Sequence, residues 1–376
     1  MKVHNKFWIF SVLISGVLLF LTASCSKNDE PVPQSGPKFY QSISAGGYHS
    51  LGLEPNGTLW AWGGNYKGQL GDSTLEDKHS PVQIGPGFAA ISAGYEFSLA
   101  LGKDSTLWGW GDNQQGQIGD KTLSDKYIPV LIDSGFIAIA AGYRHSLALK
   151  ADSSLWAWGQ NTYGQLGNGG YSDKKEPVLI GYDYVAIAAG GDHSLALKTD
   201  HTLWAWGYNY YGQLGDSTLV SKNTPVMIGS DFKAIAVGAN HSLAVKIDGS
   251  LWVWGHNNFG QLGDNSSADA RKPKQISTGY AAVAAGSLYS MGIKTDGTLW
   301  AWGENKYFGH LGDGTNVNQK TPVQIGSDYE KIAAGNFHSL GLKNNGRLLA
   351  WGSNRFGQIG DETTADRNTP VQLGPN

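Results

Sequence analysis

The sequence has little cysteine, little net charge and no helical hydrophobic pattern. Its 376 residues include a single cysteine, Cys25, which excludes a disulfide framework and a cysteine-ligated metal site. The net charge is −3, and it becomes −5 without residues 1–25 because Lys2 and Lys6 are lost with them. This net charge does not indicate the basic surface that nucleic-acid binding requires, so we expect no nucleic-acid partner. A hydrophobic fraction of 40% with 53 glycines indicates a folded, turn-rich protein.

What the sequence does contain is a repeat of fixed period. Leu-Trp-x-Trp-Gly occurs six times at 48-residue steps, and the seventh copy has Leu349 in place of the first Trp. Such a period, in a chain without helical patterning, indicates a propeller or solenoid array. The repeats are 38–85, 86–133, 134–181, 182–229, 230–277, 278–326 and 327–374.

The third repeat predicts four short strands, at 136–141, 145–150, 154–158 and 177–180, with Pro177 opening an outer strand. Seven such units predict an all-β, seven-bladed β-propeller of four-stranded antiparallel blades. Both Trp of Trp-x-Trp share one strand face, and we expect neighbouring blades to bury them. We also expect some mixing of N- and C-terminal strands in one blade.

The first 37 residues are predicted to be a targeting segment and a tether. A positively charged start, an apolar core over 7–21 and small residues before Cys25 are typical of a signal peptide, 1–25. The segment resembles a bacterial lipoprotein signal in which Cys25 is lipidated, although the bulky aliphatic residue stands four positions before the Cys rather than three. An ordinary secretory signal is the alternative. The polar residues 26–37 predict a disordered tether. We therefore expect an exported lipoprotein anchored by lipid in the outer membrane or at the cell surface, or else a secreted soluble protein.

The repeat carries four motifs in a fixed order. These are Ala-Gly-x-x-His-Ser, Leu-Trp-x-Trp-Gly, Asn-x-x-Gly-Gln-Leu-Gly and Pro-Val. Together they resemble the repeat of the regulator of chromosome condensation family, over the whole chain beyond the tether. That family includes a nuclear nucleotide-exchange factor, ubiquitin-ligase regulatory domains and a secreted bacterial inhibitor of β-lactamases. The resemblance therefore implies a fold without choosing an activity.

No motif argues for catalysis. Five repeats carry a His-Ser pair, but adjacent strand residues face opposite ways and cannot act together as base and nucleophile. Phe97 and Tyr289 replace the His in the other two repeats, which favours a packed aromatic ring over a metal site. The Asp after Gly-Gln-Leu-Gly has no second acid at a fixed offset, so we expect a turn role rather than calcium binding. We expect no catalytic residue, no metal and no cofactor.

The two residues between Ala-Gly and His-Ser vary. If the loops served the fold alone, all repeats could share one residue there; neutral drift at exposed tips is the alternative. A ring of such loops on one propeller face suits a protein-binding surface. In the family's exchange factor, partner-contacting residues lie in this loop, and by position Glu96 and Asp192 correspond, with Arg144 between them. Exchange itself is not expected, because the near-equal repeats leave no projecting insertion. The candidate partner-binding residues are Tyr48, Tyr95, Glu96, Tyr143, Arg144, Asp192, Asn240, Leu288 and Phe337.

A second variable region follows Trp-x-Trp-Gly. Its aromatic residues either stack on sugars or pack against the next loop; they are Tyr163, Tyr211, Phe259, Phe308 and Phe356. We therefore expect a non-catalytic, monomeric binding module for an unidentified protein. The alternatives are a glycan-binding or enzymatic propeller with an axial site, and an inhibitor of a secreted enzyme.

Overall fold

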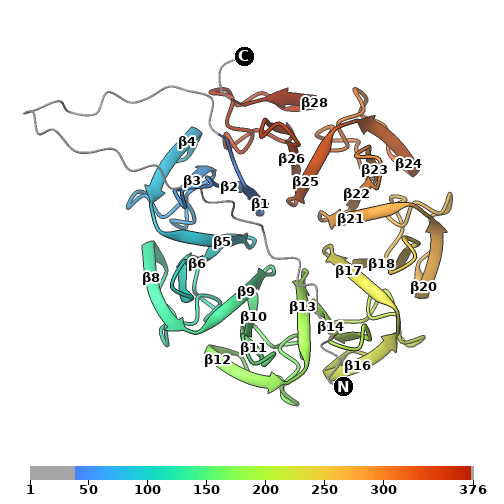
Figure 1. The fold of residues 1–376 in the computed structure, drawn as a ribbon, viewed down its shortest axis with the longest axis horizontal. Helices are drawn as coiled ribbons and strands as arrows, with labels where there is room; N and C mark the ends of the chain where they lie inside the picture. The colour runs from blue at the N-terminus through green and yellow to red at the C-terminus, as the bar shows by residue number, and fades with distance from the viewer. Residues whose placement is uncertain (1–38, 374–376) are drawn as a thin grey trace, which may run out of the picture. The chain divides into compact units, whose positions relative to one another are not determined.

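Seven four-stranded antiparallel sheets stand radially around one axis in the computed structural model, which describes residues 39–373 (Figure 1). Each sheet consists of four consecutive strands, so each repeat forms one blade, numbered 1 to 7 in chain order. This confirms the all-β, seven-bladed propeller. Residues 39–373 contain no helix that could cross a membrane. The expected signal peptide, Cys25 and the tether lie outside the described residues.

The strands occupy equivalent positions in every blade. The innermost strands are β1 (Ser42–Ala45), β5 (Phe88–Ala93), β9 (Phe136–Ala141), β13 (Tyr184–Ala189), β17 (Phe232–Val237), β21 (Tyr280–Ala285) and β25 (Tyr329–Ala334). The second strands are β2 (His49–Leu53), β6 (Phe97–Gly102), β10 (His145–Lys150), β14 (His193–Lys198), β18 (His241–Lys246), β22 (Tyr289–Lys294) and β26 (His338–Lys343). The third strands are β3 (Leu59–Gly63), β7 (Thr106–Gly111), β11 (Leu155–Gly159), β15 (Leu203–Gly207), β19 (Leu251–Gly255), β23 (Leu299–Gly303) and β27 (Leu348–Gly352). The outer strands are β4 (Lys78–Gly85), β8 (Lys126–Ser134), β12 (Lys174–Gly181), β16 (Lys222–Gly229), β20 (Ala270–Ser277), β24 (Gln319–Gly326) and β28 (Arg367–Gln372).

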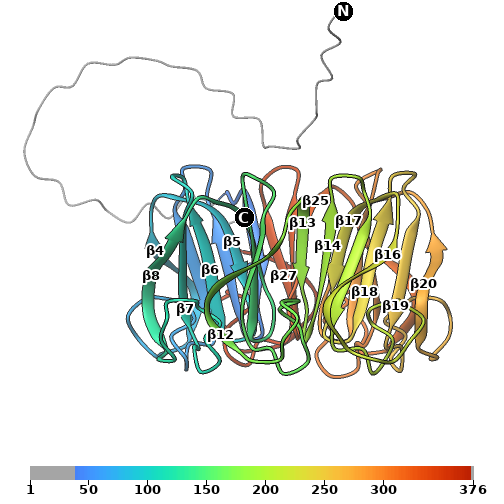
Figure 2. The same cartoon turned by 90° about the horizontal axis from the view of Figure 1, so that it is seen from below.

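The strand register sorts the loops onto two faces (Figure 2). In blade 3, Gly159 pairs with His145 on one side and with Lys174 on the other. The loop between the first and second strands therefore opens on the same face as the loop between the third and fourth. We call these the inner and outer loops, and the face that they form is the loop face. The remaining loops form the opposite face.

The core lies between blades, where the second Trp of each pair is buried. Trp206 of blade 4 is fully buried against Leu147, Leu155 and Leu166 of blade 3. Its indole nitrogen donates to the backbone oxygen of Gln165, 2.9 Å away. The first Trp of each pair packs on the same neighbour but is only partly buried. The expected burial of the Trp pairs between blades is thus confirmed, most fully for the second Trp.

The ring closes without exchanging strands, so the expected mixing of terminal strands is wrong for residues 39–373. Blade 1 contains only β1–β4 and blade 7 only β25–β28. The junction between them repeats the other interfaces. Trp62 of blade 1 packs on Leu340 and Ile359 of blade 7 and donates to Gln358 O at 3.0 Å. Because every repeat supplies both sides of this contact, ordinary packing completes the circle.

The outer strand of blade 3 is longer than predicted. β12 begins at Lys174, so Pro177 is its fourth residue rather than its first. β12 pairs on one side only, with β11. A proline, which lacks an N–H, is tolerated inside such an edge strand.

Candidate binding face

The histidine ring is structural, as its replacement by aromatic residues predicted. His193 is fully buried, and its Nε2 lies 2.9 Å from Ser242 Oγ of the next blade. Ser242 in turn donates to the backbone oxygen of Gln213 at 2.8 Å. Equivalent His–Ser contacts of 2.8 to 3.0 Å are made by His49, His145, His241 and His338. Each histidine therefore joins two blades.

These contacts fix the histidine tautomer. Since the Ser242 hydroxyl donates its proton to Gln213, it must accept one from His193 Nε2. Nδ1 of His193 is then unprotonated, and it is buried without a hydrogen-bond partner in the described part of the chain. Burial lowers the pKa of His193 to about 3, because the charged ring would lose its hydration. A neutral, buried imidazole of this kind has a structural role, because it holds two blades together.

The Asp after Gly-Gln-Leu-Gly organises the outer loop. Asp72 Oδ1 accepts from Asn65 Nδ2 at 2.9 Å and from the Thr74 backbone N–H at 3.0 Å. The bond from Thr74 closes an Asx turn, and the bond from Asn65 joins this turn to the start of the outer loop. No group of His, Cys, Asp or Glu suited to a metal ion occurs within residues 39–373.

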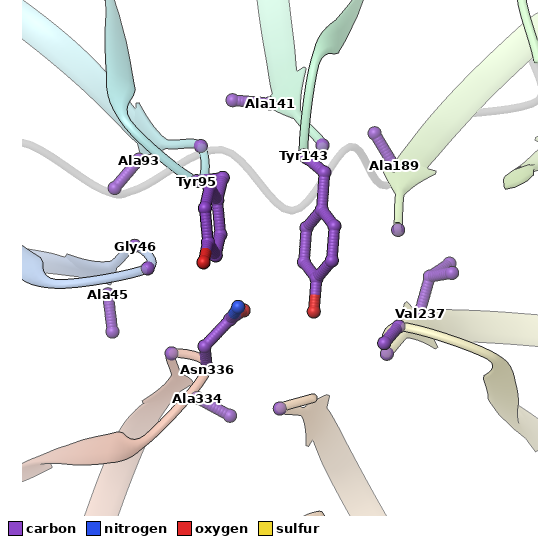
Figure 3. Close-up of a pocket in the computed structure, with 18 of the residues that line it drawn as sticks. Ala45, Gly46, Ala93, Tyr95, Ala141, Tyr143, Ala189, Val237, Ala334 and Asn336 are labelled. Carbon is purple, nitrogen blue, oxygen red and sulfur yellow. The ribbon is translucent and has the colours of Figure 1, made fainter. Parts of the chain in front are cut away.

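The first variable residue of the inner loop points toward the axis where it carries a long side chain, in blades 2, 3 and 7 (Figure 3). Figure 3 shows Tyr95, Tyr143 and Asn336 directed into the central opening. The Tyr143 hydroxyl crosses the axis and donates to Ser287 Oγ of blade 6, at 3.1 Å. The axial cavity is only about 70 Å³. Small-molecule sites usually enclose ~300–1,000 Å³, so the axial channel itself is too small for a sugar or a substrate of ordinary size.

The glycine that precedes the variable pair is fixed by space. A Cβ on Gly142 would lie 2.6 Å from both Gly190 O and His145 Cε1. In blade 3 the inner loop thus has one position without room for any side chain, followed by Tyr143 and Arg144.

The second variable residue of an inner loop contacts the outer loop of the preceding blade. The Tyr66 hydroxyl donates to Glu96. Gln165 Nε2 donates to Asp192 Oδ1 at 3.1 Å, and Gln213 and Asn240 form the equivalent pair at 3.3 Å. Inner and outer loops therefore interlock into one continuous surface.

Tyr48 is the centre of an aromatic cluster on this surface. Its ring lies 5.5 Å from Tyr95, 5.6 Å from Phe337 and 5.2 Å from Phe356, measured between centroids. Its hydroxyl lies 3.0 Å from that of Tyr95. Tyr95 continues the cluster to Tyr143, at 5.0 Å. Side chains from blades 1, 2, 3 and 7 are thereby held against one another.

A second aromatic series runs over blades 3 to 5. Tyr163 and Tyr208 have ring centroids 4.6 Å apart, and Tyr211 lies 6.4 Å from Tyr208 and 4.4 Å from His256. Tyr210 is 64% exposed beside them. The outer-loop aromatic residues therefore pack on one another and also present open rings to solvent.

A recess of about 440 Å³ lies between these two aromatic groups. Its lining residues come from blades 2, 3, 4, 6 and 7; they are Tyr95, Tyr143, Arg144, Gln160, Tyr163, Asp192, Ser287, Asn336 and Phe337. Five of the predicted partner-binding residues and two further inner-loop residues meet here. Tyr48 contacts the lining residue Tyr95, and Glu96 follows Tyr95 in the same loop. Asn240 and Leu288 lie elsewhere on the loop face.

The recess holds two opposite charges that are not paired with each other. Arg144 is exposed, and its guanidinium forms no hydrogen bond or ion pair with residues 39–373. Asp192 is partly buried, and Gln165 is its hydrogen-bond donor. Burial raises the pKa of Asp192, and the positive charge of Arg144 only partly opposes that rise. A carboxylate held in this way retains capacity to accept a further hydrogen bond.

Gln160, Tyr66 and Tyr208 were missed as site residues by the sequence reasoning. Gln160 and Tyr208 directly follow Trp-x-Trp-Gly. The residue at that position differs in all seven repeats, reading Gly64, Asp112, Gln160, Tyr208, His256, Glu304 and Ser353. The same variability that singled out the inner loops was therefore present here.

Comparison with known proteins identifies one matching family and several solved structures with the same fold. The RCC1-like domain family matches residues 20–277 and, again, 178–376. The RCC1 domain-containing protein RUG3 of Arabidopsis thaliana mitochondria is 41% identical over 54 residues, which are 14% of this chain and 12% of that protein.

The structural likeness extends over most of the chain. Human WBSCR16 superposes with a TM-score of 0.77 at 23% identity, covering 85% of this chain and 94% of that one. Prp20p of Saccharomyces cerevisiae, a structure reported with its binding to Gsp1p and histones, gives 0.71 at 23% identity, covering 81% and 83%. With the family match over nearly the whole chain, the protein belongs to the RCC1-like domain family.

Proposed function

We propose that this protein is a non-catalytic binding module whose loop face engages a protein partner. The observation that carries the proposal is the aromatic cluster around Tyr48. It gathers rings from inner and outer loops of several blades on one face. Tyr and Phe are enriched at protein interfaces because they supply large contact area at a low cost in side-chain entropy.

The charged residues give the same face its specificity. Glu96 is held by Tyr66 and Asp192 by Gln165, whereas Arg144 is unpaired within residues 39–373. Their alternating signs favour a partner with complementary charges and discourage others. Prp20p, with its reported binding to Gsp1p and histones, is an example of this fold in a protein that binds proteins. Its likeness to this chain concerns the fold, so the loop residues support the proposal here.

Partner capture tests the proposal. The purified protein would be compared with a Glu96→Ala, Arg144→Ala, Asp192→Ala variant, using extracts of the producing cell and its surroundings. Tyr182→Ala is the matched control, because Tyr182 is a 54% exposed tyrosine between β12 and β13, on the opposite face. We expect a protein that the parent and the control retain and the triple variant loses. A partner retained equally by all three would place binding outside the loop face.

We also propose that the protein is exported and attached to a membrane through Cys25. The support is the sequence of residues 1–25. Labelled fatty acid should be incorporated by the parent chain and not by a Cys25→Ser variant, which should leave the membrane fraction. Incorporation that survives the substitution would contradict this part of the proposal.

A further inference from the structure

The central recess presents hydrogen-bonding groups of both kinds. Arg144 only donates, and Asp192, when ionised, only accepts. Gln160 does both, and its carboxamide makes no hydrogen bond to the described residues. Arg144 and Asp192 line the same recess without an ion pair within residues 39–373. A guest that occupies the recess must therefore satisfy a donor and an acceptor.

A guest that carries a single charge satisfies only one of the two. An anion would bind Arg144 but would lie near the carboxylate of Asp192. A cation would bind Asp192 but would lie near Arg144. A hydroxyl group accepts from one neighbour and donates to another, so neutral hydroxylated guests use both side chains without an opposing charge.

The recess walls exclude a guest that is polar on every side. Tyr95, Tyr163 and Phe337 line it, and Tyr143 lies across the axis with its hydroxyl bonded to Ser287. Aromatic rings of this kind cover apolar C–H surface. A pyranose combines a C–H face with a rim of hydroxyls. A volume of about 440 Å³ is in the ordinary range for small ligands.

The aromatic series beyond the recess extends this environment. From Tyr163 it continues through Tyr208 and Tyr211 to His256. A guest longer than one ring would meet successive aromatic side chains along blades 3 to 5. Aromatic side chains thus extend from the recess across blades 3 to 5.

We propose that the central recess binds a neutral saccharide, so that the partner engaged by the loop face is a glycan-bearing molecule. The proposal rests on the proposed function, because it names the chemistry of that partner. Asp192 and Gln160 accept from sugar hydroxyls, Arg144 donates to a sugar oxygen, and Tyr163 stacks on the ring. The saccharide is then a glycan carried by that protein partner; a free polysaccharide offers the same chemistry and is the other source that the experiment distinguishes.

Calorimetric titration of the protein tests the inference directly. The probes are the neutral sugars glucose, galactose, mannose and N-acetylglucosamine, with the charged analogues glucuronate and glucosamine. We expect saturable binding of at least one neutral sugar, with its charged analogue about tenfold weaker. Absence of binding by every neutral sugar at its highest soluble concentration, or tighter binding of a charged analogue, would overturn the inference.

Variants locate the site. Asp192→Ala, Arg144→Ala and Tyr163→Ala should each weaken binding of the neutral sugar by about tenfold. Tyr210→Ala is the matched control, because Tyr210 is an exposed outer-loop tyrosine outside the recess. It should change the affinity by less than about twofold. Equal losses for Tyr163→Ala and Tyr210→Ala would contradict the assignment to the recess.

Glycan removal separates this inference from the proposed function. A captured protein partner would be treated with glycosidases, and polysaccharide fragments would be titrated in parallel. Loss of the partner after treatment supports a glycoprotein, and binding of the fragments supports a polysaccharide. A partner that still binds after deglycosylation, through residues of the loop face, overturns the saccharide and leaves protein binding intact.

Discussion

The Tyr143 hydroxyl of blade 3 donates a hydrogen bond to Ser287 Oγ of blade 6, 3.1 Å away across the propeller axis. These two residues are 144 positions apart in sequence. Tyr143 lines both the axial cavity and the central recess, and Ser287 lines the recess, so the bond lies where the two cavities meet. A ligand on this face would therefore occupy the central recess, which inner and outer loops border, rather than the axial channel.

A double-mutant cycle on this pair should reveal direct coupling. Tyr143→Phe and Ser287→Ala each remove the bond, and each should lower the free energy of unfolding by about 1 kcal/mol. The double variant should lose less than the sum, with a coupling energy of about 0.5–1.5 kcal/mol from denaturant titration. Additive losses would show that the bond contributes nothing in solution.

The closing junction should be as strong as an ordinary blade interface. Trp62 and Trp206 are both fully buried and both donate to a backbone oxygen of the preceding blade in the ring. Replacing either with Ala should cost about 3–5 kcal/mol in the free energy of unfolding. Trp204→Ala should cost less, because Trp204 is only partly buried.

The comparison between the two buried tryptophans is the informative one. A much smaller loss for Trp62→Ala than for Trp206→Ala, measured by urea unfolding, would mean that the junction between blades 1 and 7 is held by other contacts.

The buried histidines should make stability fall as the pH falls. In the folded chain His193 has a pKa of about 3, against an ordinary value of 6.5. Between these values the unfolded chain binds a proton that the folded chain excludes, so acid favours unfolding. Each such histidine contributes about 1.4 kcal/mol per pH unit to the fall in the free energy of unfolding. The contribution is complete below about pH 3 and absent above pH 6.5.

His193→Phe should reduce that slope by one proton. Phe97 already occupies this position in blade 2, where Ser146 still donates to Gln117 O at 2.7 Å. Urea unfolding between about pH 4.5 and 6.5 measures the change in slope. Ile137→Phe is the control, because it places the same ring at an exposed strand position without removing an ionisable group; it should leave the slope close to that of the parent. An unchanged slope for His193→Phe would show that this histidine is protonated in the folded protein.

Removing Arg144 should raise the pKa of Asp192 further. Burial raises this pKa and the charge of Arg144 lowers it, so Arg144→Ala removes the lowering contribution. Arg144→Lys retains a positive charge and should leave the pKa nearer to that of the parent. Carboxyl-carbon NMR titration gives the value for each protein. An Asp192 pKa that is the same with Ala as with Arg would show that the two groups do not interact.

The repeat was enough to predict the blade architecture, because one sheet cannot bury the Trp face alone. In the third repeat it also predicted β9 and β10 over their full lengths. The repeat did not predict how blades 1 and 7 join to close the ring. Whether terminal strands exchange depends on the fit between blades 1 and 7, where Trp62 repeats the ordinary contact. Pro177 indicated an outer strand, but not that β12 begins three residues before it, at Lys174, which the unpaired outer edge allows.

The sequence identified several residues of the candidate site, but their spacing could not show which of them come into contact. The inner-loop residues Arg144 and Asp192 were found, and Tyr163 was recognised in a separate region. That Asp192 receives a hydrogen bond from Gln165 depends on how blade 4 stands beside blade 3. That Tyr143 reaches Ser287 depends on the radius of the ring. Both are properties of the closed propeller rather than of one repeat.

The most direct test of the binding face is hydrogen–deuterium exchange of the protein with and without its captured partner. We expect protection of the inner and outer loops around the central recess, including residues 142–144 and 160–173. The loops of the opposite face, including residues 151–154, should exchange at unchanged rates. Protection confined to the opposite face or to the outer strands would contradict the assignment of the loop face as the partner-binding surface.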